Sequence, residues 1–178
     1  FQAYRKVRDE IEITSADGHI LTKINSPVEN VRDFLQSQNN YFAALEEAAE
    51  DLCEKAGILF QGNSGEKAAM ENPLANIANH ISNTAGLRVR VLPVKVMHNQ
   101  LRRYDQHRRE ILLSEALRRP QRQFHLLVQY ALLSQQDKLD DICATLGSED
   151  QQTVSLLKVT LAAYFAGAVM MPYNSFLD

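Results

Sequence analysis

The stretch LRVRVLP, residues 87–93, alternates apolar and basic side chains along its length. A period of two is typical of a β-strand, because successive side chains point to opposite faces. The pattern predicts a strand with arginines on one face and Leu87, Val89 and Val91 on the other. This strand decides the fold class, because the longer segments around it have helical patterns.

Two shorter stretches downstream are also predicted as strands. Residues 101–104 and 110–113 flank the turn Asp105-Gln-His107, as the two arms of a hairpin do. With residues 87–93 they predict a small sheet that carries most of the arginines. The fold class is therefore predicted as α+β, mostly helical with a small antiparallel sheet.

Charge is distributed unevenly along the chain. Residues 88–122 contain ten basic and three acidic residues, so they carry a net +7 although the whole chain carries −3. Nine of the ten basic residues are arginine, whose planar guanidinium suits phosphate oxygens. The cluster fits contact with phosphate or nucleic acid, and it also fits a solvated strand face.

The segments after the sheet have helical periodicity. Pro120 opens a helix over residues 120–136, a short helix follows over 139–146, and the last helix ends at Pro172. Ser148 is expected to cap that last helix. The apolar residues of both long helices recur at a helical spacing and are expected to point inward.

The longest predicted helix runs from Pro27 to Gly57. Ser26 can cap it, Pro27 suits a first turn, and Glu29 completes a capping box. Its apolar residues follow a 3-4 alternation, which fits either a helix packed on its own domain or a dimer seam. The residues of this stripe are Val28, Val31, Leu35, Phe42, Leu45, Ala49 and Leu52.

The remaining segments are shorter. Residues 10–24 alternate around Asp17-Gly18 and predict either a β-hairpin or an extended linker from an upstream part. Residues 61–72 are rich in Gly, Asn and Ser and predict a surface loop. Pro73 then opens a short helix that leads into the first strand.

Two helical stretches resemble the signature motifs of the ImmA/IrrE family of zinc metallopeptidases. Residues 122–132 read RQFHLLVQYAL, where that family reads roughly Arg-x-Phe-x-Leu-Ala-His-Glu-x-x-His. Residues 161–172 read LAAYFAGAVMMP, where the family reads roughly Glu-Ala-Asn-x-Phe-Ala-Ala-x-x-Leu-Met-Pro. The resemblance implies a zincin-like scaffold. The framework positions that match are Phe124, Leu126, Phe165, Ala166, Met171 and Pro172.

The positions that carry chemistry in that family do not match. The resemblance places the two zinc histidines at Val128 and Leu132, the catalytic glutamate at Gln129 and the third ligand at Leu161. Zinc takes nitrogen, sulfur or carboxylate ligands, and a glutamine amide does not act as a base near neutral pH. His125 is nearby but alone. No catalytic residue, no metal ligand and no enzymatic activity are therefore expected.

A narrower group is more similar to this chain. Five short segments of this chain resemble segments of bacterial transcription regulators that respond to short-chain acyl-CoA. They are residues 31–34, 39–41, 43–52, 101–104 and 108–115. These regulators, of the propionate- and acetate-metabolism type, carry a degenerate ImmA/IrrE domain. They also have an upstream helix-turn-helix and a cysteine-rich region downstream. The resemblance thus implies a ligand-sensing domain whose effector modulates DNA binding.

The resemblance also implies an organisation and a set of partners. Residues 1–26 would be a linker or hairpin from an upstream DNA-binding part, and residues 27–178 the degenerate ImmA/IrrE-like sensing domain. DNA would be contacted through a helix-turn-helix absent from this chain, and no cofactor is expected in this piece. A homodimer in the cytoplasm is expected. No membrane partner is expected, because no apolar run reaches about 18 residues.

The sensor hypothesis assigns residues to two parts of an acyl-CoA ligand. Phosphates would contact arginines of the sheet, adenine would stack on an aromatic ring, and the acyl chain would occupy the former zinc cleft. The phosphate-binding candidates are Arg88, Arg90, Arg102 and Arg108, with Tyr104 for stacking. The candidates for the acyl slot are Phe124, Val128, Tyr130, Leu132, Leu161, Tyr164 and Phe165.

Three alternatives stay open at this point. The apolar residues of the former cleft could simply fill it as core. The arginine-rich sheet could bind nucleic acid directly, with a steep dependence on salt. The scaffold could serve only dimerisation or interaction with another protein, through the helix expected from Pro27 to Gly57.

Overall fold

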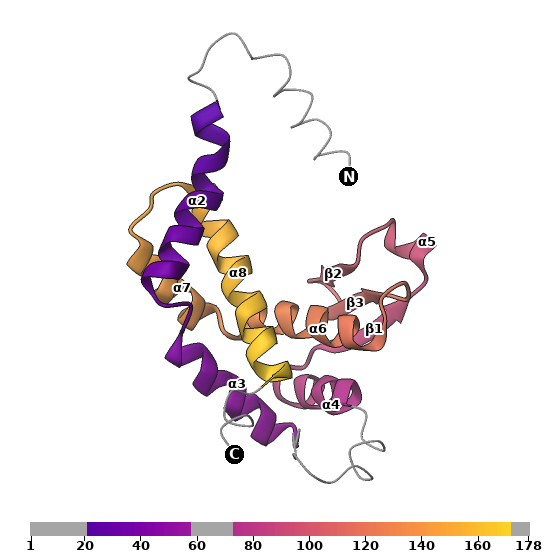
Figure 1. Ribbon diagram of the computed structural model, residues 1–178. Coiled ribbons are helices and arrows are strands. Elements are labelled where there is room, and N and C mark those ends of the chain that lie inside the picture. Colours follow the sequence, from indigo (N-terminus) through magenta and orange to yellow (C-terminus); the bar gives the residue numbers. More distant parts are fainter. Residues whose placement is uncertain (1–20, 58–72, 172–178) are drawn as a thin grey trace.

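A computed structural model describes residues 21–57 and 73–171 of the chain. Its helices and strands follow one another in the order that Figure 1 shows. They are α2 (Leu21–Ser37), α3 (Ala43–Lys55), α4 (Pro73–Ala85), β1 (Arg88–Leu92), α5 (Val94–Met97), β2 (Arg102–Asp105), β3 (Glu110–Ser114), α6 (Arg119–Ser134), α7 (Gln136–Leu146) and α8 (Gln151–Met170). The α+β class, mostly helical with a small sheet, is confirmed.

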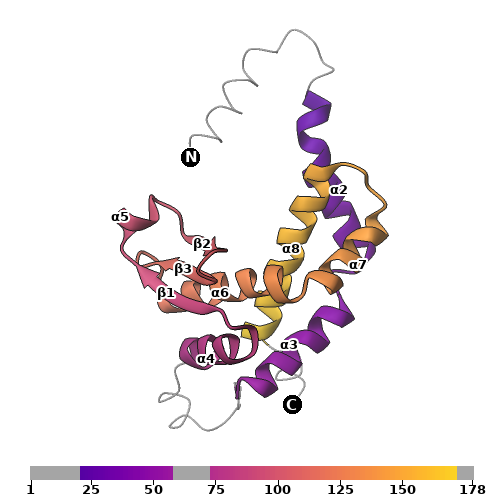
Figure 2. The ribbon, with the colours of Figure 1, turned by 180° about the vertical axis from the view of Figure 1, so that it is seen from behind.

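Helix α8 lies at the centre of the helical part. It packs against α2, α3, α6 and α7, and both Figure 1 and Figure 2 show it between α2 and α6. Helix α6 packs on its other side against the sheet and against α4. Residues Leu157, Leu161 and Phe165 of α8 are fully buried. One core therefore runs from the helical layer through α6 to the sheet.

The sheet is mixed, where the sequence led us to expect an antiparallel one. Its strand order is β1-β3-β2, with β3 parallel to β1 and antiparallel to β2. Parallel neighbours need a crossover, and here the chain passes through α5 and β2 before β3 returns beside β1. As the central strand, β3 is buried along its whole length.

The strand register assigns each side chain to one face of the sheet, because cross-strand partners point the same way. Leu113 lies opposite Val91 and Arg102, and Ile111 belongs to the same face. Ile111 and Leu113 share a core with residues of α6, so this is the face that α6 covers. On the opposite face, Leu112 lies between Arg90 and Arg103.

The helix expected from Pro27 to Gly57 is two helices in the structure. Helix α2 ends at Ser37, and Asn39 and Asn40 adopt left-handed backbone with φ of 54° and 52°. Asparagine tolerates this conformation better than other non-glycine residues, so the pair turns the chain. The sequence contained this signal, but the apolar periodicity on both sides concealed the break.

The beginning of this helix also differs from expectation. Helix α2 begins at Leu21, and Pro27 lies inside it rather than in its first turn. Residues 21–24, which were expected in the second arm of a hairpin, are helical. Residues 10–20 of that hairpin and the loop expected over 61–72 lie outside the described residues.

The apolar stripe of α2 and α3 faces the core of its own chain. Val31, Phe42, Leu45, Ala49 and Leu52 are all buried, and both helices pack on α8. The reading of this stripe as a dimer seam is therefore wrong, because α8 already covers it. Of the residues in the stripe, Val28 alone is widely exposed.

The three helices expected after the sheet, and the helix opened by Pro73, are confirmed in place. The cap of α8 is Asp150 rather than Ser148. The Asp150 carboxylate accepts hydrogen bonds from the backbone N–H groups of Gln152 and Thr153, at 3.3 and 3.0 Å. The Ser148 hydroxyl accepts instead from the backbone N–H of Asp150, at 3.2 Å.

Helix α8 has the length and apolar composition of a membrane-spanning helix. It has 20 residues and contains an 18-residue window with a mean hydropathy of 1.6, so by length and composition it could cross a bilayer. The expectation that no uninterrupted apolar run reaches this length is not contradicted, because Lys158 lies within the helix. Four helices pack around α8, however, and a core helix meets the same criteria.

Candidate ligand-binding site at helices α6 and α8

The residues that stand at the family's zinc-ligand positions lie together in the core between α6 and α8. Val128 of α6 is 3% exposed and Leu161 of α8 is 0% exposed, and both belong to one buried cluster. Leu132, one turn after Val128, is partly buried and packs against that cluster. The two helices are direct neighbours. The former ligand positions thus lie in or against one core, on two neighbouring helices, and carry apolar side chains.

These residues do not fit a zinc ion. Val128, Leu132 and Leu161 carry no nitrogen, oxygen or sulfur in their side chains, and zinc takes three such ligands from the protein in a catalytic site. Across residues 21–57 and 73–171, no three His, Cys, Asp or Glu side chains come together as a metal site would need. Gln129, at the position of the catalytic glutamate, is half-buried.

The interior of this helix pair is filled by protein side chains. Leu161 and Phe165 are 0% exposed, and the rings of Tyr130 and Phe165 lie 6.3 Å apart. Phe124 and Leu132 are only partly buried and lie at the margin of the core.

The structure separates Tyr164 from the other aromatic candidates of α8 and α6. Its hydroxyl donates a hydrogen bond to Glu46 and accepts a 3.5 Å hydrogen bond from the backbone N–H of Phe42. The ring of Phe42 packs edge-on against Tyr164, with centroids 5.3 Å apart. Burial, followed by the bond to Glu46, raises the pKa of Tyr164 to about 12. Tyr164 therefore belongs to the corner between α2 and α3.

Tyr130 is also oriented toward α3. It is buried, and burial together with the nearby carboxylate of Asp51 raises the pKa of its phenol. Asp51 and its ion-pair partner Lys55 lie in the last turns of α3. Tyr130 thus lies in the core on the side of α6 that is nearest α3. Its ring also contacts the ring of Phe165, which lies in the core between α6 and α8.

The four arginines proposed for phosphate binding do not share one face. Arg88 and Arg90 of β1 are on the face opposite α6, whereas Arg102 of β2 is on the α6 face. Arg90 is bound to the buried carboxylate of Glu110 at 3.5 Å. Arg108 lies in the exposed turn between β2 and β3. A single phosphate group cannot contact all four side chains in this arrangement.

Arg102 of β2 and His125 of α6 lie on two elements that contact each other. Both are half-buried, and α6 packs against β2. Burial lowers the pKa of the Arg102 guanidinium. Burial and then the positive charge of Arg102 lower the pKa of His125. Tyr104 lies on the same face of β2 as Arg102 and packs against the core.

This scaffold identifies the chain's family. The chain belongs to the family of IrrE N-terminal-like domains, whose model matches residues 83–178. The matched segment begins near the end of α4 and includes the sheet and helices α6 to α8. The resemblance of residues 122–132 and 161–172 to this family is thereby confirmed.

Known transcription regulators are similar to most of this chain. The HTH-type transcriptional regulator PrpR of Mycobacterium tuberculosis is 30% identical over 150 residues, which are 84% of this chain and 29% of PrpR. The propionyl-CoA carboxylase regulator of Cereibacter sphaeroides is 34% identical over 154 residues, which are 86% of this chain and 29% of that protein. The chain thus spans less than a third of the length of these curated relatives.

A solved structure is similar in fold. A transcriptional regulator of Mycobacterium tuberculosis superposes with a TM-score of 0.74 and is 28% identical. The match covers 84% of this chain and 42% of that chain. It extends beyond the segment that the family model matches, so the helices before the sheet belong to the shared architecture.

Proposed function

We propose that this chain is the ligand-sensing part of a bacterial transcription regulator and that it binds a short-chain acyl-CoA. The effector would modulate DNA binding by a segment upstream of the chain. Residues 1–26 would connect to that segment, and residues 27–178 would form the sensor. Helix α2 begins at Leu21 and so would carry the connection across this boundary.

One observation supports a sensor rather than a peptidase. Apolar side chains at 128, 132 and 161 occupy the zinc-ligand positions of the family and lie in the α6–α8 core. A hydrolase of this family needs ligands there to activate water. The proposed protein is therefore not an enzyme and needs no metal in this piece.

The name of one relative mentions an acyl-CoA, as part of the name of the enzyme that it regulates. One relative is named a propionyl-CoA carboxylase regulator, and PrpR is named an HTH-type transcriptional regulator. Coenzyme A offers phosphates for arginine and a thin apolar arm for a narrow site. In this chain, Arg102 lies on the α6 face of the sheet, and Phe124 lies at the margin of the α6–α8 core. Both ends of such a ligand could therefore be bound beside α6.

Thermal unfolding with a panel of ligands tests this proposal. A ligand present at 100 times its dissociation constant stabilises a protein by about 2.7 kcal/mol, which raises the unfolding midpoint by about 5–10 °C at this size. We expect acetyl-CoA or propionyl-CoA to produce such a shift, and free acetate or propionate to produce none. Equal midpoints with and without every acyl-CoA would contradict the proposal.

Direct binding of nucleic acid is the second candidate. Arg88 and Arg103 are exposed on the face of the sheet away from α6. If this face binds phosphodiesters, a duplex oligonucleotide will stabilise the chain at low salt and lose its effect as salt rises. The same thermal assay, with oligonucleotide in place of acyl-CoA, separates the two candidates.

The cytoplasmic location and the homodimer are parts of the same proposal. The buried stripe of α2 and α3 cannot supply the dimer contact, so a dimer would use another surface. Sedimentation equilibrium of the purified chain measures the oligomeric state. A monomer at every concentration would contradict a dimer formed by this piece alone.

A further inference from the structure

Strand β1 has one open edge. It is an outer strand of the sheet, and β3 is its neighbour on one side only. The N–H of Arg88 and the carbonyl of Leu92 each form a hydrogen bond on the β3 side, at 3.0 and 2.9 Å. Backbone polar groups alternate in direction along a strand, so those of Val89 and Val91 point away from β3. Among the described residues, no strand pairs with this edge.

The side chains of β1 give this edge one basic face and one apolar face. Arg88 and Arg90 lie on the face away from α6, and Val89 and Val91 lie on the α6 face. Val91 is 42% exposed. Arg90 is bound to Glu110, whereas Arg88 is exposed and has no ion pair or hydrogen bond of its guanidinium within the described part of the chain. A strand that alternates acidic and apolar side chains would complement such an edge, because cross-strand neighbours share a face.

Residues 10–13 of this chain have that complementary pattern. Their sequence is Glu-Ile-Glu-Ile, and its alternation predicted a strand. Beside a parallel strand in this segment, each arginine of β1 would have a carboxylate as its neighbour and each valine an isoleucine. The neighbours in that register are Glu10 and Arg88, Ile11 and Val89, Glu12 and Arg90, and Ile13 and Val91.

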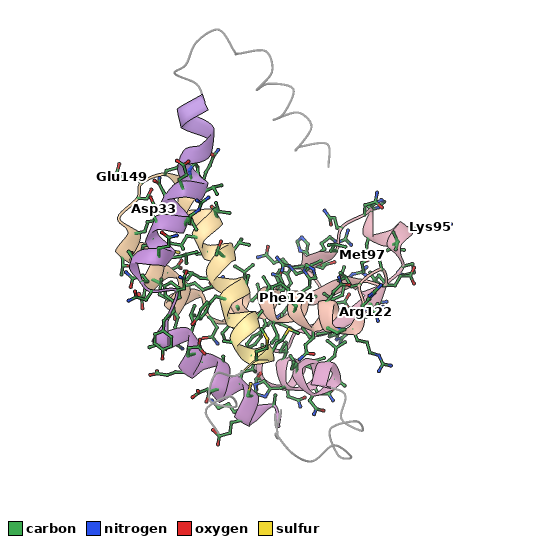
Figure 3. All side chains as sticks on the ribbon, viewed as in Figure 1. Asp33, Lys95, Met97, Arg122, Phe124 and Glu149 are labelled. Carbon is green, nitrogen blue, oxygen red and sulfur yellow. The ribbon has the colours of Figure 1, made fainter. Side chains whose placement is uncertain are left out.

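The reach of the chain favours β1 of a second copy over β1 of the same copy. Residues 10–14 lead into α2, which packs on α8, and α8 packs on α6, which packs on the sheet. Three such layers span about 25–30 Å, whereas residues 15–20 span at most about 25 Å when fully extended. Figure 3 shows Asp33 of α2 and Lys95 of α5, the helix after β1, on opposite sides of the molecule.

We propose that residues 10–14 of one copy of this chain pair, as an added strand, with the open edge of β1 in a second copy. Exchange in both directions holds two copies together and covers Val91 in each. The isoleucines extend the apolar layer on the α6 face, and the glutamates neutralise the arginines on the other face. The inference rests on the homodimer of the proposed function and assigns the surface that forms it.

Crosslinking between single-cysteine variants tests which residues meet. Ile13→Cys and Val91→Cys are prepared separately, mixed and oxidised, so that a 13–91 disulfide can form only between two copies. Neighbouring side chains on paired strands are close enough for this bond. The native thiols, Cys53 and Cys143, are buried. We expect a linked dimer whose peptides, identified by mass spectrometry, join residues 13 and 91. Leu101→Cys is the control partner, because Leu101 is 47% exposed and lies at the other edge of the sheet.

Reversal of single charges tests the pairing without a new covalent bond. Arg88→Glu and Glu10→Arg should each weaken the dimer by about 2- to 30-fold in sedimentation equilibrium, because a symmetric dimer contains the exposed pair twice. The two changes combined should restore the dimer. Arg108→Glu, an equal change of charge in the exposed turn after β2, should have little effect. Rescue of Arg88→Glu by Glu12→Arg instead of Glu10→Arg would show an antiparallel strand on the same edge.

The outcomes separate this inference from the rest of the proposed function. If the chain is a dimer but residues 13 and 91 do not link, or the reversed charges do not rescue one another, the surface is wrong and the homodimer stands. A double variant with both cysteines that links only within a monomer overturns the exchange between copies. A monomer at every concentration overturns both the surface and the homodimer. Binding of acyl-CoA is measured separately by thermal unfolding, and none of these outcomes decides it.

Discussion

The hydroxyl of Tyr164 on α8 donates a hydrogen bond to the carboxylate of Glu46 on α3. The same oxygen accepts from the backbone N–H of Phe42, the residue that precedes α3. Phe42 also stacks with Phe34 of α2, with ring centroids 6.4 Å apart. One side chain of the central helix thus holds the corner where α2 turns into α3. Tyr164 thereby connects α8 to α2 through Phe42 and Phe34.

Removing this hydroxyl should weaken the corner. We expect Tyr164→Phe to lower the free energy of unfolding by about 1–2 kcal/mol, because Glu46 and the Phe42 N–H lose a partly buried partner. Urea unfolding measures the change. Tyr41→Phe is the control, because Tyr41 is exposed on the same corner. Equal stabilities of the two variants would show that the hydrogen bonds contribute nothing.

Stability should also fall at alkaline pH through the same group. The folded pKa of Tyr164 is raised to about 12, above the ordinary value of 10.0. Its contribution is therefore complete below about pH 10 and is lost as pH rises toward about 12, because the unfolded phenol ionises first. The raised pKa of buried Tyr130 acts in the same direction. Unfolding midpoints at about pH 9 and about pH 11 should differ less in Tyr164→Phe than in the original chain.

Substitutions of Asn40 test whether α2 and α3 are two helices or one continuous helix, because Asn40 lies in the turn between them. Its φ of 52° is unfavourable for residues with a Cβ, so Asn40→Ala should destabilise the chain by about 1 kcal/mol. Asn40→Gly should be tolerated, because glycine adopts this backbone freely. Chemical denaturation of both variants gives the comparison. If Ala stabilised the chain and Gly destabilised it, the helix would be continuous here.

Leu161 should behave as a core residue. We expect Leu161→Ala to reduce the free energy of unfolding by about 2–5 kcal/mol, because it leaves a cavity between α6 and α8. Val159 lies on the same helix and is 46% exposed, so Val159→Ala should change stability by less than about 0.5 kcal/mol. Similar losses in both variants would indicate that residue 161 is not part of a packed core.

Local sequence patterns predicted most elements but not how they assemble. The alternation at 87–93 and the helical spacing around Phe124 and Phe165 each depend on neighbours in the chain, and these elements are where they were expected. The order β1-β3-β2 depends on pairing between distant segments, which no local pattern reveals. The break at Asn39 and Asn40 was visible as a pair of turn-forming residues, but the apolar stripe continued across it.

For the candidate site too, the sequence predicted local features but not their arrangement in space. The apolar replacement at Val128, Leu132 and Leu161 was apparent from motif alignment, and the structure brings these residues into one core. The separation of Arg102 from Arg90 could not be predicted, because it follows from the cross-strand register. A one-residue change of register would exchange the faces of Arg102 and Arg103.

Isothermal titration of the purified chain with propionyl-CoA tests the central claim most directly. If the chain is a sensor of acyl-CoA, one propionyl-CoA will bind per chain with saturation, and propionate will give no heat of binding. Added zinc will not change the affinity for propionyl-CoA. Absence of binding by propionyl-CoA and by acetyl-CoA, under conditions in which circular dichroism shows a folded chain, would contradict it.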